Sequence, residues 1–275
     1  MAPHDPHTIH QAVEARYARI ARERGSCCAA EADPAQHRGC SAPQGVGSGP
    51  VAEPASASCG LGYSVEELAS LPPGADLALG SGNPVAAAAL QPGQTVLDLG
   101  SGAGIDCFLA ARKVGSNGRV IGVDMTAAML ERARGLATAA GYDNVSFLAG
   151  QIERLPVGDA SVDRVISNCV VNLSPDKPAV WRESYRVLRP GGWLVISDIV
   201  ASDGLPAALG QRLDLACGCI AGAAPIEQVR ADLAAAGFID IRIEPQEQTR
   251  RMIEQWLAGS SGSIVSALIA ARRPA

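Results

Sequence analysis

The apolar residues in the middle of the chain gather in short runs, and the segments between these runs have apolar positions at helical spacing. The runs lie near residues 96–99, 118–124, 145–148, 162–167 and 193–197. They are nearly continuous in apolar residues, which is typical of parallel strands buried on both faces. Because these strands alternate with helical segments, residues 93–198 predict a doubly wound α/β sheet.

Helical patterns also flank this sheet. Near the start of the chain a capping box at residues 8–11 precedes apolar residues that recur along one helical face, and we expect this helix to pack on the main domain. A second capping box spans residues 64–67, and Ser174-Pro175 is a good helix start. A helix near 226–237 and strands near 239–243 and 264–270 are expected to complete the chain.

Between the first helix and the sheet lies a segment of different composition. Residues 27–58 are rich in Ala, Pro, Gly and Ser and have no apolar periodicity, which is typical of a flexible linker. We therefore divide the chain into three parts. Residues 1–62 hold the N-terminal helix and a cysteine-containing linker, residues 63–200 the central α/β domain, and residues 201–275 a smaller C-terminal part with closing strands.

Composition narrows the class of protein. Hydrophobic residues make up 47% and charged residues 19% of 275, which suits one large α/β domain with an appendage. The formal net charge of −5 argues against a nucleic-acid partner, because no basic stripe exists to neutralise phosphates. No apolar run reaches membrane-spanning length, and the N-terminus lacks a long apolar signal core. We therefore expect a cytoplasmic protein with no membrane partner. We expect a monomer, although the sequence itself leaves the oligomeric state open.

A glycine-rich turn follows the first central strand. The strand Val96–Leu99 ends in Gly100-Ser101-Gly102-Ala103-Gly104, and a helix follows from Ile105. Strand, glycine turn and helix form a loop that can cradle a nucleotide, because glycine lets the backbone approach a ligand and the helix N-terminus offers free N–H donors. Ile105 replaces the third glycine of a dinucleotide fingerprint, which disfavours an NAD-dependent oxidoreductase.

Two acids accompany this loop. Asp98 lies just before the glycines, and Asp124 ends the second strand, 20 residues after Gly104, where a ribose-binding carboxylate belongs in a Rossmann-like fold. The combination resembles motif I and its acidic partner in the class I S-adenosylmethionine (AdoMet)-dependent methyltransferases. The resemblance implies AdoMet as methyl donor, a Rossmann-like, mostly parallel sheet, and an antiparallel final strand.

Eight cysteines stand out in a chain of this class: Cys27, Cys28, Cys40, Cys59, Cys107, Cys169, Cys217 and Cys219. In a cytosolic protein, thiol or soft-metal chemistry is a better interpretation than a disulfide framework. Cys169 directly follows the fourth strand, at the sheet edge where the acceptor pocket is expected. Cys107 lies on the first crossover helix beside Phe108, and we expect it to serve packing.

The sequence around the cysteines resembles the arsenite methyltransferases. The resemblance rests on Ser167–Lys177 (SNCVVNLSPDK), Gly122–Met125 (GVDM), Asp98–Gly104 (DLGSGAG) and Gly218–Ala223 (GCIAGA). It extends over roughly residues 60–245. In that family two cysteines bind trivalent arsenic while AdoMet methylates it, and by position these are Cys169 and Cys219.

The same resemblance implies the remaining site residues and partners. Asp124 and Met125 would hold the ribose and adenine side of AdoMet, Ile152 and Glu153 the adenine, and the loop glycines the methionine end, with Asp98, Ser101 and Asn168 also at the cofactor. The substrates would be the small arsenicals arsenite and methylarsonous acid. A reducing thiol such as glutathione or thioredoxin would support the reaction, whose role would be arsenic detoxification.

One position departs from the family pattern. Ser81 stands where the family commonly has a further cysteine, and a hydroxyl will not replace a thiolate on soft arsenic. Cys59 is a candidate third arsenic ligand, Cys27, Cys28 and Cys40 are further candidates, and small-molecule thiols are the alternative. The roles of Cys27, Cys28 and Cys40, the final methylation state of the product, and activity on antimony or selenium stay open.

Two other functions compete with this one. A methyltransferase for a small organic acceptor, such as a quinone-like ring, would have the same cofactor half, and Cys169 and Cys219 would then be packing residues. A non-catalytic, thiol-based metalloid-binding protein could keep the fold but would not bind AdoMet.

Overall fold

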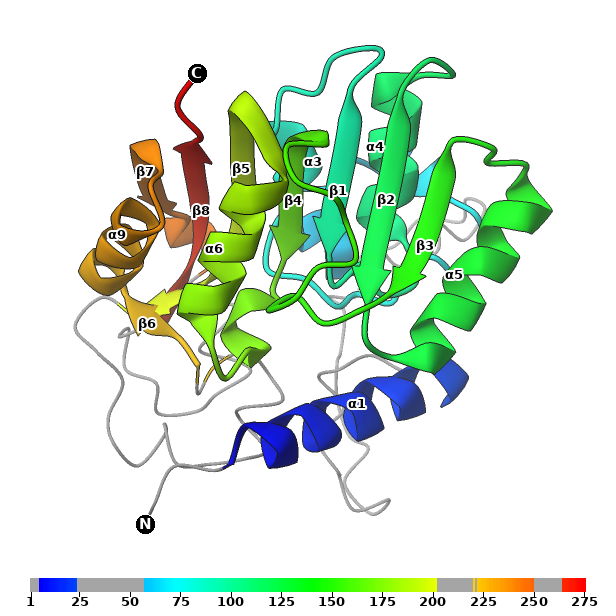
Figure 1. Ribbon diagram of the computed structural model, residues 1–275. Coiled ribbons are helices and arrows are strands. Elements are labelled where there is room, and N and C mark those ends of the chain that lie inside the picture. The colour runs from blue at the N-terminus through cyan, green and yellow to red at the C-terminus, as the bar shows by residue number, and fades with distance from the viewer. Residues whose placement is uncertain (1–4, 24–56, 202–219, 221, 250–263) are drawn as a thin grey trace, which may run out of the picture.

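The computed structural model describes residues 5–23, 57–201, 220, 222–249 and 264–275. Its centre is an eight-stranded sheet with the strand order β3-β2-β1-β4-β5-β8-β7, and β6 pairs with β5 (Figure 1). The strands are β1 (Thr95–Leu99), β2 (Arg119–Asp124), β3 (Val145–Ala149), β4 (Val162–Asn168), β5 (Leu188–Ala201), β6 (Ala224–Pro225), β7 (Ile239–Pro245) and β8 (Ile264–Arg272).

The sheet is parallel except at one strand. β8 runs antiparallel to both β5 and β7, and the other pairs are parallel. The predicted doubly wound sheet and antiparallel closing strand are therefore confirmed. Strands of the C-terminal part, β6 to β8, belong to the same sheet as the strands of the cofactor loop.

Helices cover both faces of this sheet (Figure 1). The helical elements are α1 (Pro6–Glu23), η1 (Ala57–Leu61), α2 (Val65–Ala69), α3 (Pro84–Ala87), α4 (Ile105–Val114), α5 (Ala127–Ala140), η2 (Val171–Leu173), α6 (Lys177–Val187), α9 (Ile226–Ala235) and η3 (Glu247–Thr249). α3, α4 and α5 share one buried apolar cluster with the sheet, and α6 and α9 share the other.

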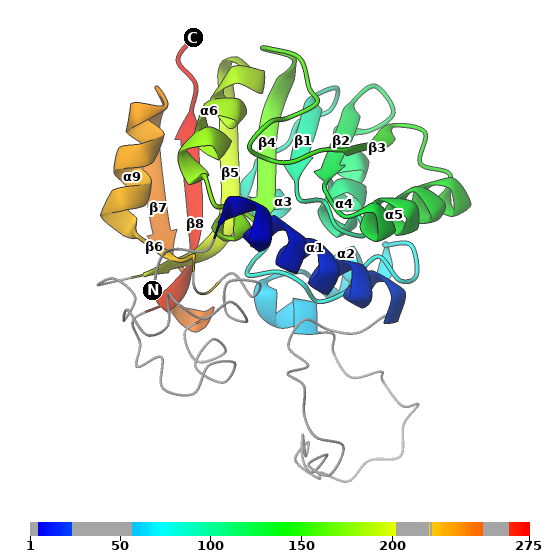
Figure 2. The same cartoon turned by 60° about the horizontal axis from the view of Figure 1, so that its bottom comes forward.

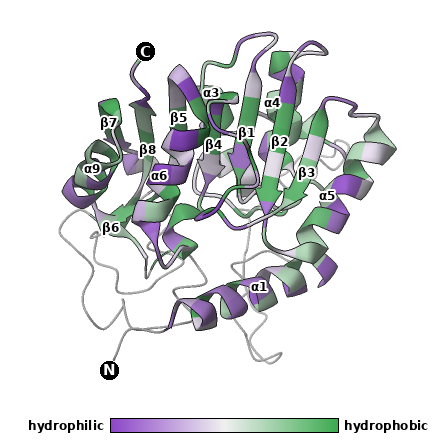
Figure 3. Ribbon diagram, in the orientation of Figure 1, coloured by the Kyte–Doolittle hydropathy of each residue, from purple (hydrophilic) through white to green (hydrophobic). Residues whose placement is uncertain are grey.

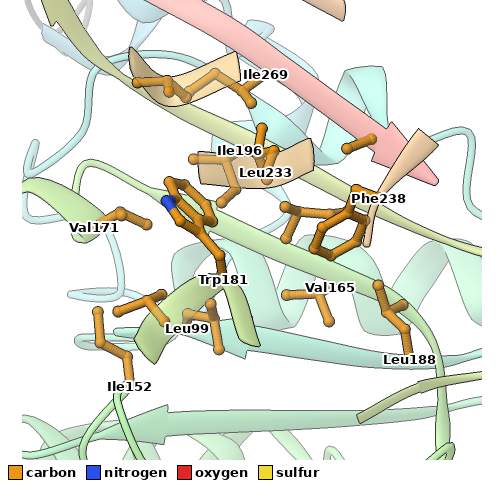
Figure 4. Close-up of a cluster of buried hydrophobic side chains, with 14 of the residues drawn as sticks. Leu99, Ile152, Val165, Val171, Trp181, Leu188, Ile196, Leu233, Phe238 and Ile269 are labelled. Carbon is orange, nitrogen blue, oxygen red and sulfur yellow. The ribbon is translucent and has the colours of Figure 1, made fainter. Parts of the chain in front are cut away.

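Trp181 of α6 lies at the centre of the second cluster. It is fully buried among side chains of the central strands and of α9, including Leu99, Ile196 and Leu233 (Figure 4). Figure 3 shows hydrophobic residues concentrated in the central strands, whereas the helices carry both hydrophobic and hydrophilic residues. With few aromatic residues in the chain, aliphatic side chains make up most of this core.

Two predicted helix starts are wrong. α1 begins at Pro6, before the expected capping box at residues 8–11, and the Ile9 N–H bonds the Asp5 carbonyl at 3.2 Å. Proline in the first turn is compatible with this earlier start. α6 is capped by Asp176 in place of Ser174, because the Asp176 carboxylate accepts the Ala179 N–H at 3.0 Å. The predicted Ser64–Glu67 capping box is present.

The first helix packs on the domain as expected. α1 lies across the end of the sheet at which β1, β2 and β4 finish, and it packs against α5 (Figure 2). Arg132 of α5 donates to the Ala21 carbonyl at 2.9 Å, and Val13 of α1 is only 2% exposed. Among the helices that the structure describes, none is long and apolar enough to cross a membrane.

Candidate functional site

A cleft with about 1020 Å³ of empty volume opens at the carboxyl ends of β1, β2 and β4. Ten of the predicted site residues line it: Asp98, Gly100, Ser101, Gly102, Asp124, Met125, Ile152, Glu153, Asn168 and Cys169. α1 closes one side of the cleft with His10, Val13 and Tyr17.

The glycine loop presents bare backbone to this cleft. Gly102 has a φ of 51°, and a Cβ placed there would meet no atom within 4 Å. Gly100 has a φ of 66°, and a Cβ there would lie 2.5 Å from the Val170 side chain. Both positions therefore need glycine. Gly102 leaves the surface of the loop open, and Gly100 lets the turn that follows β4 approach the loop.

Gly104 has a different role from the other loop glycines. It does not line the cleft. Its φ is 96°, and a Cβ there would lie 2.9 Å from both Phe108 and Phe147. The residue is the N-cap of α4 and lets that helix pack tightly on the sheet, so its contribution to cofactor binding is through the shape of the loop.

Asp124 links the loop to the end of β2. Its carboxylate accepts the Gly102 N–H at 2.9 Å and the Thr126 N–H at 2.7 Å. Burial raises the pKa of this carboxyl, and the backbone hydrogen bonds partly offset that rise. The position is where a Rossmann-like fold holds a ribose hydroxyl.

Glu153 lies across the cleft from the loop and is tied to two elements. It accepts a hydrogen bond from the Ser174 hydroxyl, and its Oε1 lies 3.1 Å from the His10 Nε2 of α1. Met125 packs with Val13 and Leu173 in the same region. Sequence reasoning assigned α1 to packing and missed His10 as a cleft residue, since nothing in the sequence relates it to Glu153.

Tyr63, Asp106 and Asn168 form a largely buried hydrogen-bonded network beside the cleft, and Asp98 lies near it. Asp106 of α4 accepts hydrogen bonds from the Tyr63 hydroxyl at 2.7 Å and from Asn168 Nδ2 at 3.2 Å. Asp98 is 2% exposed and accepts from the Cys107 thiol at 3.3 Å. Burial raises the pKa of Asp106 to about 6, and burial together with Asp106 raises that of Asp98.

This network was only partly predicted. Sequence reasoning found Asp98 and Asn168 but not Tyr63 or Asp106, which come together from segments far apart in the chain. Two buried carboxylates give the cleft floor a negative potential when ionised. That charge suits a cationic ligand, and AdoMet carries a sulfonium and an ammonium group. The residues present therefore fit the cofactor.

Cys169 has an unusual backbone conformation. Its φ is 58°, in the left-handed region that non-glycine residues rarely adopt, and its N–H donates to the Ser197 carbonyl at 2.7 Å. The side chain lines the cleft and packs against two clusters, one containing Val13 and Leu173 and the other containing Ile220. Strained residues of this kind are common at functional sites.

The other predicted arsenic ligands are placed differently. Cys59 lies half-buried on η1 and does not line the cleft, although its neighbour Ser58 does. Cys219 falls outside the described residues, as do Cys27, Cys28, Cys40 and Cys217. Cys107 is buried beneath the glycine loop, where burial and Asp98 raise the pKa of its thiol and keep it protonated.

Ser81 is also turned away from the cleft. It is 1% exposed, and its Oγ lies 3.4 Å from the Ser197 Oγ on β5. Its N–H donates to the Asn168 Oδ1 at 2.9 Å, and its carbonyl accepts from the Ser266 hydroxyl at 2.6 Å. The segment around Ser81 is therefore close to the end of β4, while its hydroxyl belongs to a buried cluster of serines.

The chain is similar to several characterised proteins. A profile of methyltransferase domains matches residues 90–255. Arsenite methyltransferase of Halobacterium salinarum is 45% identical over 278 aligned residues, which cover 100% of this chain and 69% of that protein. Arsenite methyltransferase of Aquipseudomonas alcaligenes is 45% identical over 164 residues, 57% of this chain and 47% of that protein. The chain thus matches only part of each relative.

A solved structure agrees. The arsenic(III) S-adenosylmethionine methyltransferase CrArsM of Chlamydomonas reinhardtii superposes with a TM-score of 0.61 at 34% identity, over 82% of this chain and 75% of that one. Together with the sheet order and the glycine loop, these matches define a class I AdoMet-dependent methyltransferase. Within this class, the chain belongs to the arsenite methyltransferase family.

Proposed function

We propose that this enzyme transfers methyl groups from AdoMet to trivalent arsenic held by the thiolates of Cys169 and Cys219. The observation that carries the proposal is the position of Cys169. Its side chain lines the cleft directly after Asn168, which is part of the cofactor network. Trivalent arsenic is soft and thiophilic, so a thiolate at this position is a natural ligand.

The donor half is supported by the glycine loop, Asp124 and the acidic floor. When bound, AdoMet supplies a methyl group on a sulfonium, which is electrophilic. Gly102 and its neighbours would lie along the methionine part, Asp124 at the ribose, and Met125, Ile152 and Glu153 at the adenine. α1 closes one side of the cleft and limits the access of water. Holding donor and acceptor in position is the main contribution that a protein makes to a direct displacement.

The acceptor half is supported by the residues that follow Cys219. Ile220 is buried in the cluster against which Cys169 packs, and Gly222 lies against the backbone of Asn172, three residues beyond Cys169. Neighbouring Cα atoms are about 3.8 Å apart, so chain connectivity favours Cys219 as the partner of Cys169. The arsenic lone pair would form the new As–C bond as the S–CH₃ bond breaks.

The reaction needs a reductant and a third arsenic ligand. Forming the As–C bond formally oxidises arsenic from the trivalent to the pentavalent state, and a thiol reductant such as glutathione or thioredoxin would return two electrons. Ser81 cannot donate a thiolate, so we assign the third position to a small thiol or to Cys59. Cytoplasmic thiol pools would keep these cysteines reduced. The biological role would be arsenic detoxification by a monomeric enzyme.

The first experiment is a product time course. The purified chain, AdoMet and a monothiol are incubated separately with arsenite and with methylarsonous acid. We expect turnover of both, with arsenite the slower substrate because the third cysteine is missing. Comparable rates would contradict that second expectation, and a selective gain with arsenite in Ser81→Cys would support it.

Single substitutions test the ligand assignment in the same assay. Cys169→Ser and Cys219→Ser should each lower turnover by at least ~100-fold, because a hydroxyl is a hard, weak ligand for arsenic. Cys107→Ser is the matched control and should keep most activity, since its hydroxyl can still donate to Asp98. Full activity in both test variants would refute the proposal. Failure to methylate either arsenical despite AdoMet binding would favour a methyltransferase for an organic acceptor. Failure to bind AdoMet would favour a non-catalytic metalloid-binding protein.

A further inference from the structure

A buried carboxylate at the end of β5 holds the turn that follows Cys169. Asp198 is 3% exposed, and its Oδ1 accepts the Ile199 N–H at 2.7 Å and the Asn172 Nδ2 at 2.9 Å. Its Oδ2 accepts the Asn172 backbone N–H at 3.2 Å. Asn172 Nδ2 also donates to the Ile199 carbonyl at 2.6 Å. Three of these hydrogen bonds, all from Asn172, therefore fix η2 to β5.

The chain after Cys219 meets the same turn from the other side. A Cβ placed on Gly222 would lie 2.0 Å from the Asn172 carbonyl oxygen and 2.9 Å from its carbonyl carbon. No side chain can occupy that space without displacing one of the two backbones. Ile220 is buried beside Ile199 and Ala201, and β6 pairs with Val200 and Ala201 just beyond Gly222.

Packing alone would not require a carboxyl group such as Asp198 at this contact. Burial raises the pKa of the Asp198 carboxyl to about 6, while its backbone hydrogen bonds and the Lys177 charge act in the opposite direction. A buried charged group is rarely the most stable group for such a space. Its more usual contribution is to select one arrangement of the groups that bond to it. Neither Asp198 nor Asn172 lines the cleft, so both must act through other residues.

We propose that Asp198 and Asn172 are positioning residues that hold the Cys169 turn against Gly222 and so orient the Cys169 thiol for arsenic. The proposal rests on the arsenite-methylating function inferred above. A metalloid held by two thiolates is bound as a chelate, and the second thiol binds at an effective concentration set by how firmly its segment is held. Loosening the contact weakens the chelate and leaves the AdoMet half intact.

The test compares two affinities in the full-length chain. The parent variant carries serine at Cys27, Cys28, Cys40, Cys59 and Cys217, so that other thiol pairs do not bind the probe. Phenylarsine oxide, a trivalent arsenical that takes two thiols, is titrated calorimetrically and by the ultraviolet arsenic–thiolate absorption. AdoMet is titrated separately, and its affinity reports whether the rest of the fold is intact.

Asp198→Asn and Gly222→Ala should each weaken phenylarsine oxide binding by at least ~10-fold and change the AdoMet affinity by less than ~2-fold. The matched controls are Asp232→Asn on the surface of α9 and Gly135→Ala on α5, where an added Cβ meets no atom within 4 Å. Both controls should leave the two affinities unchanged.

The outcomes separate the two proposals. Unchanged arsenical binding in both test variants would overturn the positioning role alone. A parallel loss of arsenical and AdoMet binding would also overturn it, because it would show a general structural role. If the parent does not bind phenylarsine oxide, or binds it equally well with Cys169→Ser, the proposed function fails and the positioning role fails with it.

Discussion

Two carboxylates, those of Asp98 and Asp106, line the cofactor cleft from positions almost sealed from solvent. A buried carboxylate is unfavourable unless it is compensated by hydrogen bonds or a counter-charge. Tyr63 and Asn168 donate to Asp106, but these neutral groups lower its pKa only part of the way back, leaving it at about 6. A cationic ligand in the cleft would complete the compensation.

The affinity for AdoMet should therefore depend on pH. Ionised Asp106 attracts a cation and protonated Asp106 does not, so affinity should rise as the pH increases through about 6 and level off above it. We expect a 5- to 10-fold tightening between pH 5 and pH 7, measured by calorimetry, with proton release on binding at pH 6. Asp106→Asn should flatten this profile, and an unchanged slope in that variant would assign the titration to another group.

At the scale of elements, α1 is the feature that joins the two halves of the site. Its residues contact Glu153, the proposed adenine side, and the region of Leu173 and Cys169, the proposed acceptor side. Only three described residues of the helix, Val13, Ile20 and Ala21, are buried, and Arg132 of α5 donates to the Ala21 carbonyl. Elements with few buried contacts are among the first to open locally.

Undocking α1 should expose the cleft without unfolding the sheet. Val13→Asp places a charge at a buried position, and we expect it to weaken AdoMet binding at least ~10-fold and to speed hydrogen exchange along α1. Ala15→Asp, on an exposed position of the same helix, is the control. Exchange that accelerates equally throughout the central strands would show a loss of global stability instead.

The elements also show what local sequence can and cannot predict. The central strands and their order of occurrence were predicted because continuous apolar runs and glycine turns are local signals. The start of α6 was misplaced because Ser174 and Asp176 are both good caps, and the choice depends on Glu153, which recruits the Ser174 hydroxyl from a distant loop. Tyr63, Asp106 and His10 were missed for the same reason, since their roles exist only after distant segments meet.

At the scale of the whole molecule, one sheet joins the cofactor strands to the C-terminal strands. β8 pairs with β5 along nine residue positions, and α9 packs with α6 on the apolar cluster around Trp181. Leu233 of α9 is fully buried in that cluster (Figure 4). Residues 223–249 and 264–275 are therefore expected to unfold together with the glycine loop.

Leu233→Ala tests this cooperativity. Removing a fully buried leucine should lower the free energy of unfolding by about 2–5 kcal/mol. Urea unfolding followed by tryptophan fluorescence and by loss of AdoMet binding should show one coincident transition at lower urea. Val65→Ala, at a position 67% exposed, should change stability by less than about 0.5 kcal/mol. Two separated transitions would show that the C-terminal strands are an independent unit.

The end of β4 has a consequence for the way this enzyme can change over time. Asn168 bonds the buried Asp106 and Cys169 lines the same cleft, so in the proposed function the donor and acceptor sides meet across a single peptide bond. The peptide bond between Asn168 and Cys169 thus limits how far the two residues can move apart, and no hinge between domains is needed to bring them together. Substitutions elsewhere would alter how tightly each ligand is held, but the covalent link between Asn168 and Cys169 would stay the same.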